Sequence, residues 1–162
     1  MNQLRPHIEE ILTEFFSGQL DGKTGLRRKR IEFVYSRLRE CLEAEGPRVL
    51  VTSDLVLLAA EREFHPDDAF IRTMHADDLI YTLDSFVRDP WLSENATDRR
   101  VQLRLADALA GTVLGKGLIS RGDMMCALLD LRAGIDDAYR GLKMATARSD
   151  VTPKAEKTRS GR

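Results

Sequence analysis

The chain has 162 residues and a formal net charge of −1, with 43% hydrophobic and 31% charged residues. These proportions favour one soluble globular domain and exclude a chain that is disordered throughout. The longest apolar run, Leu55 to Ala60, is far shorter than the ~20 residues needed to cross a bilayer. The first residues, MNQLRPHIEE, lack the apolar stretch of a signal peptide, so we expect a cytoplasmic protein without a membrane span.

Helical periodicity dominates the first third of the chain. A first helix is predicted to begin near Pro6, because one side of it carries the apolar residues Ile8, Ile11, Leu12, Phe15 and Phe16. A glycine-rich loop follows, and then a second helix with the apolar stripe Ile31, Val34, Tyr35, Leu38, Cys41 and Leu42. Gly46-Pro47 is a common signature of a helix C-terminus, and we expect the second helix to end there.

The remaining two thirds of the chain also favour helices. One is predicted from Thr52 or Ser53 to just before His65-Pro66, and a change of apolar phase between 66 and 88 indicates two helices or one sharply bent helix. Further helices are predicted from about 97 to 114 and after Ser120. Recurrent β-type alternation is absent. The sequence therefore predicts an all-α, single-domain bundle of five to seven helices over 1–146, followed by a disordered basic tail, 147–162.

The two cysteines bear on the cellular compartment. Cys41 and Cys126 stand singly, far apart, and each lies on or beside a helical apolar stripe. Neither has the spacing of a metal-binding pair. We therefore predict two reduced thiols in the core of a cytoplasmic protein.

The most unusual feature of the sequence is the basic segment 23–39, KTGLRRKRIEFVYSRLR, which has seven cations and one acid. Cations at the start of a helix oppose its dipole, so their presence indicates an anionic partner. Cations can neutralise phosphates, and an exposed aromatic side chain can stack on a base. On a helical wheel Lys29, Arg30, Phe33 and Arg37 lie on the side away from the apolar stripe. The predicted binding residues are Arg27, Arg28, Lys29, Arg30, Phe33, Arg37 and Arg39.

Three functions are compatible with this sequence. The leading hypothesis is a non-enzymatic binding or regulatory protein whose basic helix contacts an anionic partner, either nucleic acid or an acidic protein surface. The second hypothesis is an assembly module that forms a homo-oligomer such as a homodimer. In it the basic helix docks on the acidic segment 53–98 of another copy. That segment has eleven acids and three cations.

The third hypothesis is a metal-dependent enzyme. His65, Asp68, His75 and Asp78 carry side chains that can bind divalent metals and activate water. However, ten residues of helix separate the two histidines by about 80° around the axis, and acidic pairs are also typical of the first turns of helices. No catalytic or phosphate-binding motif occurs, so no cofactor or named reaction is predicted.

Overall fold

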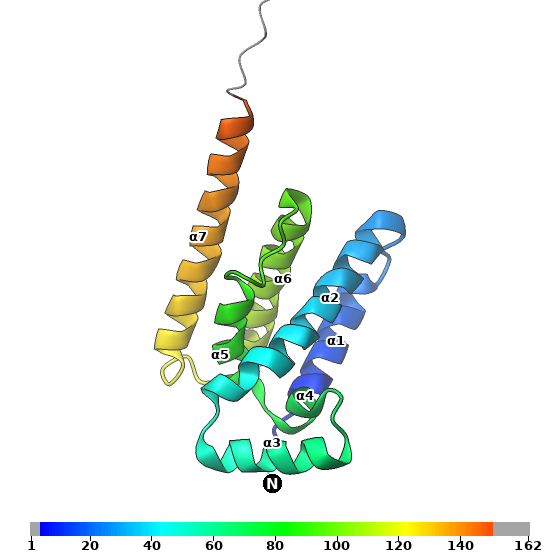
Figure 1. Ribbon diagram of the computed structural model, residues 1–162, viewed down its shortest axis with the longest axis vertical. Coiled ribbons are helices and arrows are strands. Elements are labelled where there is room, and N and C mark those ends of the chain that lie inside the picture. The colour runs from blue at the N-terminus through cyan, green and yellow to red at the C-terminus, as the bar shows by residue number, and fades with distance from the viewer. Residues whose placement is uncertain (1–3, 151–162) are drawn as a thin grey trace, which may run out of the picture.

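The computed structural model describes residues 4–150, and these residues form seven α-helices and one 3-10 turn, with no β-strand among them (Figure 1). The prediction of an all-α bundle of five to seven helices is confirmed. None of the described helices is long and apolar enough to cross a bilayer. In chain order the elements are α1 (Ile8–Leu20), α2 (Gly25–Glu45), η1 (Gly46–Val49), α3 (Thr52–Phe64), α4 (Ala69–Thr73), α5 (Ala76–Phe86), α6 (Ala96–Gly115) and α7 (Met125–Ser149).

The long helix α2 lies at the centre of the bundle. It packs against α1, α4, α5 and α6, while α7 packs against α5 and α6. Helix α3 runs across one end of the bundle, and the C-terminal end of α7 points away from the opposite end (Figure 1). The core is a single cluster, to which α3 contributes one buried side chain, Leu58.

The helices form where the sequence provides an apolar stripe and a starting signal. All five predicted apolar residues of α1 are buried, and the α2 stripe is buried except for Tyr35, which is half-buried. Asn95 begins α6 by accepting hydrogen bonds from the backbone N–H groups of Thr97 and Asp98. The change of apolar phase corresponds to a break between α4 and α5, so two helices occupy this region rather than one.

Two expectations need adjustment. Cys41 is buried as predicted, but Cys126 is exposed, so the prediction of two core thiols is wrong for Cys126. The reason is its position beside the α7 stripe, one residue before the buried Ala127. Helix α7 also continues to Ser149, three residues into the predicted tail, and residues 151–162 of that tail lie outside the described part of the chain.

Candidate anion-binding surface

All seven predicted binding residues lie on α2, but they differ in exposure. Arg27, Arg28 and Lys29 are exposed on the first turns of the helix, and Phe33 is 50% exposed. Arg30, Arg37 and Arg39 are half-buried. The surface predicted from the sequence is therefore divided between side chains that face solvent and side chains that contact the rest of the protein.

The half-buried cations bind partners within the same chain. Arg37 donates hydrogen bonds to the backbone carbonyls of Pro90 and Trp91, at 3.1 and 3.2 Å, and its guanidinium lies 5.4 Å from the Trp91 ring centroid. Arg39 forms an ion pair with Asp68, and this hydrogen bond raises the pKa of Arg39 despite partial burial. These two arginines therefore stabilise the packing of α2 on distant segments; the charge of Arg39 is matched by Asp68, whereas the Arg37 guanidinium is held by backbone carbonyls and an aromatic ring.

The cations near the start of α2 are only partly matched. Arg28 pairs with Glu32 one turn later, at 2.9 Å, and Arg30 pairs with Asp98 in the first turn of α6, at 3.2 Å. Arg27 and Lys29 form no ion pair with any residue in the range 4–150. These unmatched cations lie at the N-terminal end of α2, where the helix dipole is positive. An anionic ligand would be stabilised there by both the cations and the dipole.

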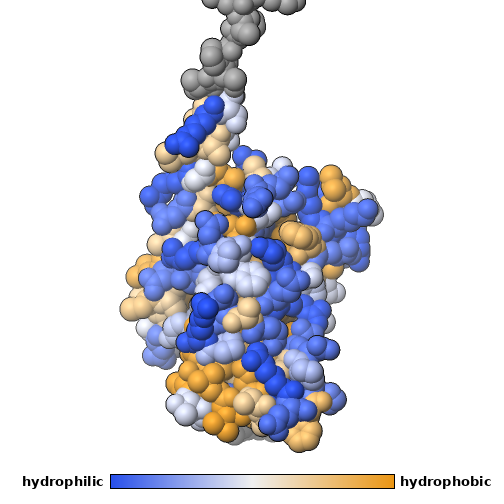
Figure 2. Space-filling model, in the orientation of Figure 1, coloured by the Kyte–Doolittle hydropathy of each residue, from blue (hydrophilic) through white to orange (hydrophobic). Residues whose placement is uncertain are grey.

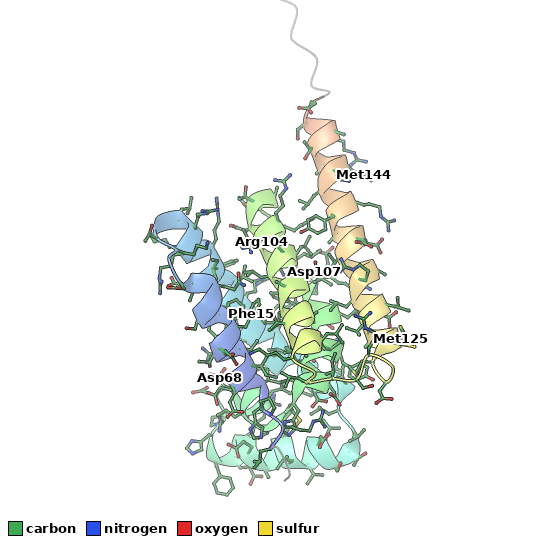
Figure 3. All side chains as sticks on the ribbon, turned by 180° about the vertical axis from the view of Figure 1, so that it is seen from behind. Phe15, Asp68, Arg104, Asp107, Met125 and Met144 are labelled. Carbon is green, nitrogen blue, oxygen red and sulfur yellow. The ribbon has the colours of Figure 1, made fainter. Side chains whose placement is uncertain are left out.

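A groove lies beside these cations, between the first turns of α2 and the middle of α6. It encloses about 440 Å³, and its lining includes Lys23, Arg27 and Arg30 from the predicted basic segment and Arg104 from α6. Ile31 and Val101 also line it. Of the described residues that line the groove none is acidic. Figure 3 shows Arg104 on the upper half of α6. We call this feature the cationic groove.

Arg104 is the residue of the cationic groove that the sequence analysis missed. It is exposed and pairs with no acid among residues 4–150, although Val101 and Leu105 beside it carry the α6 stripe. Arg104 is 74 residues from Arg30 in the sequence, and only the packing of α6 against α2 brings the two side chains to the same groove. A lone arginine on a helix face gives no signal of that packing in the sequence.

The acids of segment 53–98 are also largely matched within the chain. Besides the pairs of Asp68 and Asp98 with α2, Glu61 pairs with Arg72 and Asp84 with Arg88. The basic helix and the acidic segment thus contact each other within one chain, and fewer of these charges remain for contact with another copy.

The side chains considered for a metal site do not converge. Asp68 is bound to Arg39, and Asp78 accepts a hydrogen bond from the backbone N–H of His75, at 3.2 Å. The His75 ring is stacked on His7, with the ring centroids 4.7 Å apart. Over residues 4–150, no group of three or more His, Cys, Asp and Glu side chains is placed to hold a metal ion.

Comparison with protein-family models, with curated proteins and with solved structures finds no match to this chain. Function is therefore inferred from the geometry and charge of the described residues. The cationic groove is the feature in which several like charges from separate segments meet without an acid in the lining.

Proposed function

We propose that the protein is a non-enzymatic helical binding protein that contacts nucleic acid through the cationic groove. The observation that carries this proposal is the convergence of Lys23, Arg27, Arg30 and Arg104 from α2, α6 and the loop before α2 around one groove. Arg30 is paired with Asp98, but Lys23, Arg27 and Arg104 form no ion pair within residues 4–150. Folding brings these like charges together at an electrostatic cost, and an anionic ligand would remove that cost. We expect the protein to act in the cytoplasm, where free thiols stay reduced.

Nucleic acid fits this surface better than a small anion because the cations continue beyond the groove. Lys29 and Phe33 are exposed and lie one turn apart on α2. Lys29 precedes Arg30, and Phe33 lines a second hollow together with Arg37 and Arg99 and the acids Asp89 and Glu94. A phosphate backbone along α2 could contact several cations in succession, and a base could stack on Phe33. Contacts of this kind carry little sequence information, so we expect binding that tolerates many sequences.

The test is a salt titration of binding to labelled duplex and single-stranded DNA. Binding to duplex should weaken steeply with salt, because each neutralised phosphate releases condensed counterions. Arg27→Glu/Arg104→Glu should reduce affinity by about tenfold or more and make the slope of log K against log salt shallower by about two. The matched control is Arg121→Glu/Lys143→Glu, which makes the same change in net charge at exposed positions of another surface.

The control variant should bind as the wild type does. Equal affinity and equal salt slopes for the wild type and Arg27→Glu/Arg104→Glu would overturn the proposal, as would the absence of wild-type binding at low salt. A protein that binds an acidic polypeptide but no nucleic acid would support the alternative of a protein-interaction module.

The assembly alternative, in which the basic helix docks on the acidic segment of another copy, has a distinct signature. Such a complex would dissociate as salt rises, because surface ion pairs are screened. The ion pairs Arg30–Asp98 and Arg39–Asp68 leave fewer charges for it. Light scattering at low and high salt separates this assembly from nucleic-acid binding.

A further inference from the structure

Helix α3 has an apolar outer surface. Leu58 is its one buried side chain, whereas Val56 is 66% exposed and Phe64 is 78% exposed. Figure 2 shows a hydrophobic region over the end of the molecule where α3 lies. The exposed apolar residues of this helix, which we call the α3 face, are Leu55, Val56, Leu57, Ala59, Ala60 and Phe64.

A helix on the surface of a globular protein normally presents polar side chains to water. The α3 face instead exposes apolar area on the order of 500 Å², which is near the upper limit for the largest patch on a monomer. The largest apolar patch on a monomer is often a contact surface, so the α3 face is a candidate docking surface.

The charges around α3 argue against a membrane surface as the occupant. Helices that lie on anionic membranes carry Lys and Arg beside their apolar face. Here Asp54, Glu61 and Glu63 accompany the apolar residues, and Arg62 binds the side chain and backbone of Glu43. The end of α7, from which the predicted tail would continue, lies at the opposite end of the bundle (Figure 1).

We propose that a second copy of this chain covers the α3 face, with the two α3 helices antiparallel about a twofold axis near Ala60. The stripe Val56, Ala60 and Phe64 runs along one side of the helix at offsets of four residues. A twofold axis at Ala60 would place Val56 of each copy opposite Phe64 of the other. Alanine at the axis permits the two helices to approach closely, and the three stripe residues are uncharged. The exposed Glu63, one turn from Ala60, would lie beside the stripe, opposite Leu57 of the other copy.

The area supports a dimer of modest affinity. Two such faces would bury at most about 1,000 Å² in total, below the roughly 1,200–2,000 Å² of stable interfaces and in the range of weak, transient ones. The dimer should therefore depend on protein concentration. It should persist at high salt, because burial of apolar area is not screened by ions. The cationic groove would stay open in this dimer, because α3 and the first turns of α2 lie toward opposite ends of the bundle (Figure 1).

Sedimentation equilibrium between micromolar and millimolar concentrations tests the proposal. The wild type should shift from the 18.3 kDa monomer toward twice that mass as concentration rises, at low and at high salt alike. Val56→Glu/Phe64→Glu should stay monomeric, whereas the control Leu129→Glu/Met144→Glu, which also replaces two exposed apolar residues by acids, should dimerise as the wild type does. Thermal unfolding confirms that both variants fold.

A second measurement locates the axis. Ala60→Cys in a Cys126→Ser background should form an intermolecular disulfide under mild oxidation, since residues on a twofold axis bring their Cα atoms within disulfide range. Ala133→Cys in the same background, at an exposed position of α7, should not. A wild type that is monomeric at every concentration, or a dimer that survives in Val56→Glu/Phe64→Glu, would overturn the proposal. The monomer outcome would assign the α3 face to a different protein.

Discussion

Substitution of Gly46 by alanine probes a close contact between the turn that follows α2 and the buried ring of Phe70. Gly46 follows the last residue of α2 and is buried, with φ −54° and ψ −41° in the helical region. Pro47 follows it, and a residue with a Cβ is disfavoured in that region before proline, so the backbone adds to the cost of a side chain here. A Cβ atom built at this position would lie 2.4 Å from both Cε2 and Cζ of Phe70. Phe70 cannot retreat easily, because its ring is fully buried and its backbone N–H donates to the Glu43 carboxylate at 2.8 Å.

The expected effect of Gly46→Ala follows from two opposing contributions. Removal of glycine flexibility from the unfolded chain would stabilise the protein by about 0.4–1 kcal/mol where space is available. Overpacking of a filled core costs about 1–3 kcal/mol, and a clash with a buried ring lies at the upper end of that range. We therefore expect Gly46→Ala to lower the free energy of unfolding by about 2–2.5 kcal/mol.

Urea denaturation followed by circular dichroism measures this change. The matched control is Gly18→Ala in α1, where no atom lies within 4 Å of the added Cβ and the φ angle is ordinary, so that variant should be slightly stabilised. Phe70→Leu should relieve the clash, so the double variant should be more stable than the sum of the two single changes predicts. Equal stabilities for Gly46→Ala and Gly18→Ala would refute the steric reasoning.

Three further measurements test the packing. At pH 8 a thiol reagent should label Cys126 quickly and Cys41 only on unfolding, because burial raises the pKa of the Cys41 thiol to about 12; two rapidly labelled thiols would contradict this. Gln102→Leu should lower the free energy of unfolding by about 2–4 kcal/mol in denaturant titrations, because the buried amide makes three hydrogen bonds to the backbone of 86–93. Burial also raises the pKa of Asp78, so ionisation of this carboxyl opposes folding. As pH rises from about 3 to 7, the free energy of unfolding of Asp78→Asn should therefore increase relative to that of the wild type. A decrease relative to the wild type would exclude burial as the dominant effect on Asp78.

Local periodicity predicted the elements that bury one face. The apolar stripes of α1 and α2 were identifiable because each repeats every three to four residues and faces a single core. At Gly46 the sequence predicted the end of α2 correctly, but the Gly-Pro signature did not reveal why glycine occupies this position. Gly46 itself has helical backbone angles. The close approach of Phe70 and the proline that follows are what disfavour a side chain at this position.

Helix α3 shows what periodicity could not predict. The run Leu55 to Ala60 has the composition of a buried segment, and its helical state was predicted correctly. Burial depends on which neighbours surround the helix, and α3 packs mainly on the short helix α4. The same limit explains Arg104, whose place in the cationic groove follows from the packing of α6 on α2.

The start of α2 shows which of its cations the fold itself requires. Four consecutive cations oppose the helix dipole, at a cost of about 0.3–1 kcal/mol each when exposed at low salt. Glu32 and Asp98 offset this cost for Arg28 and Arg30, but Arg27 and Lys29 have no such partner among residues 4–150. Arg27→Gln/Lys29→Gln should therefore raise the free energy of unfolding slightly at low salt while weakening binding to DNA. Higher stability with weaker DNA binding would identify Arg27 and Lys29 as residues of the binding surface. Lower stability with unchanged affinity would instead identify them as residues that stabilise the fold.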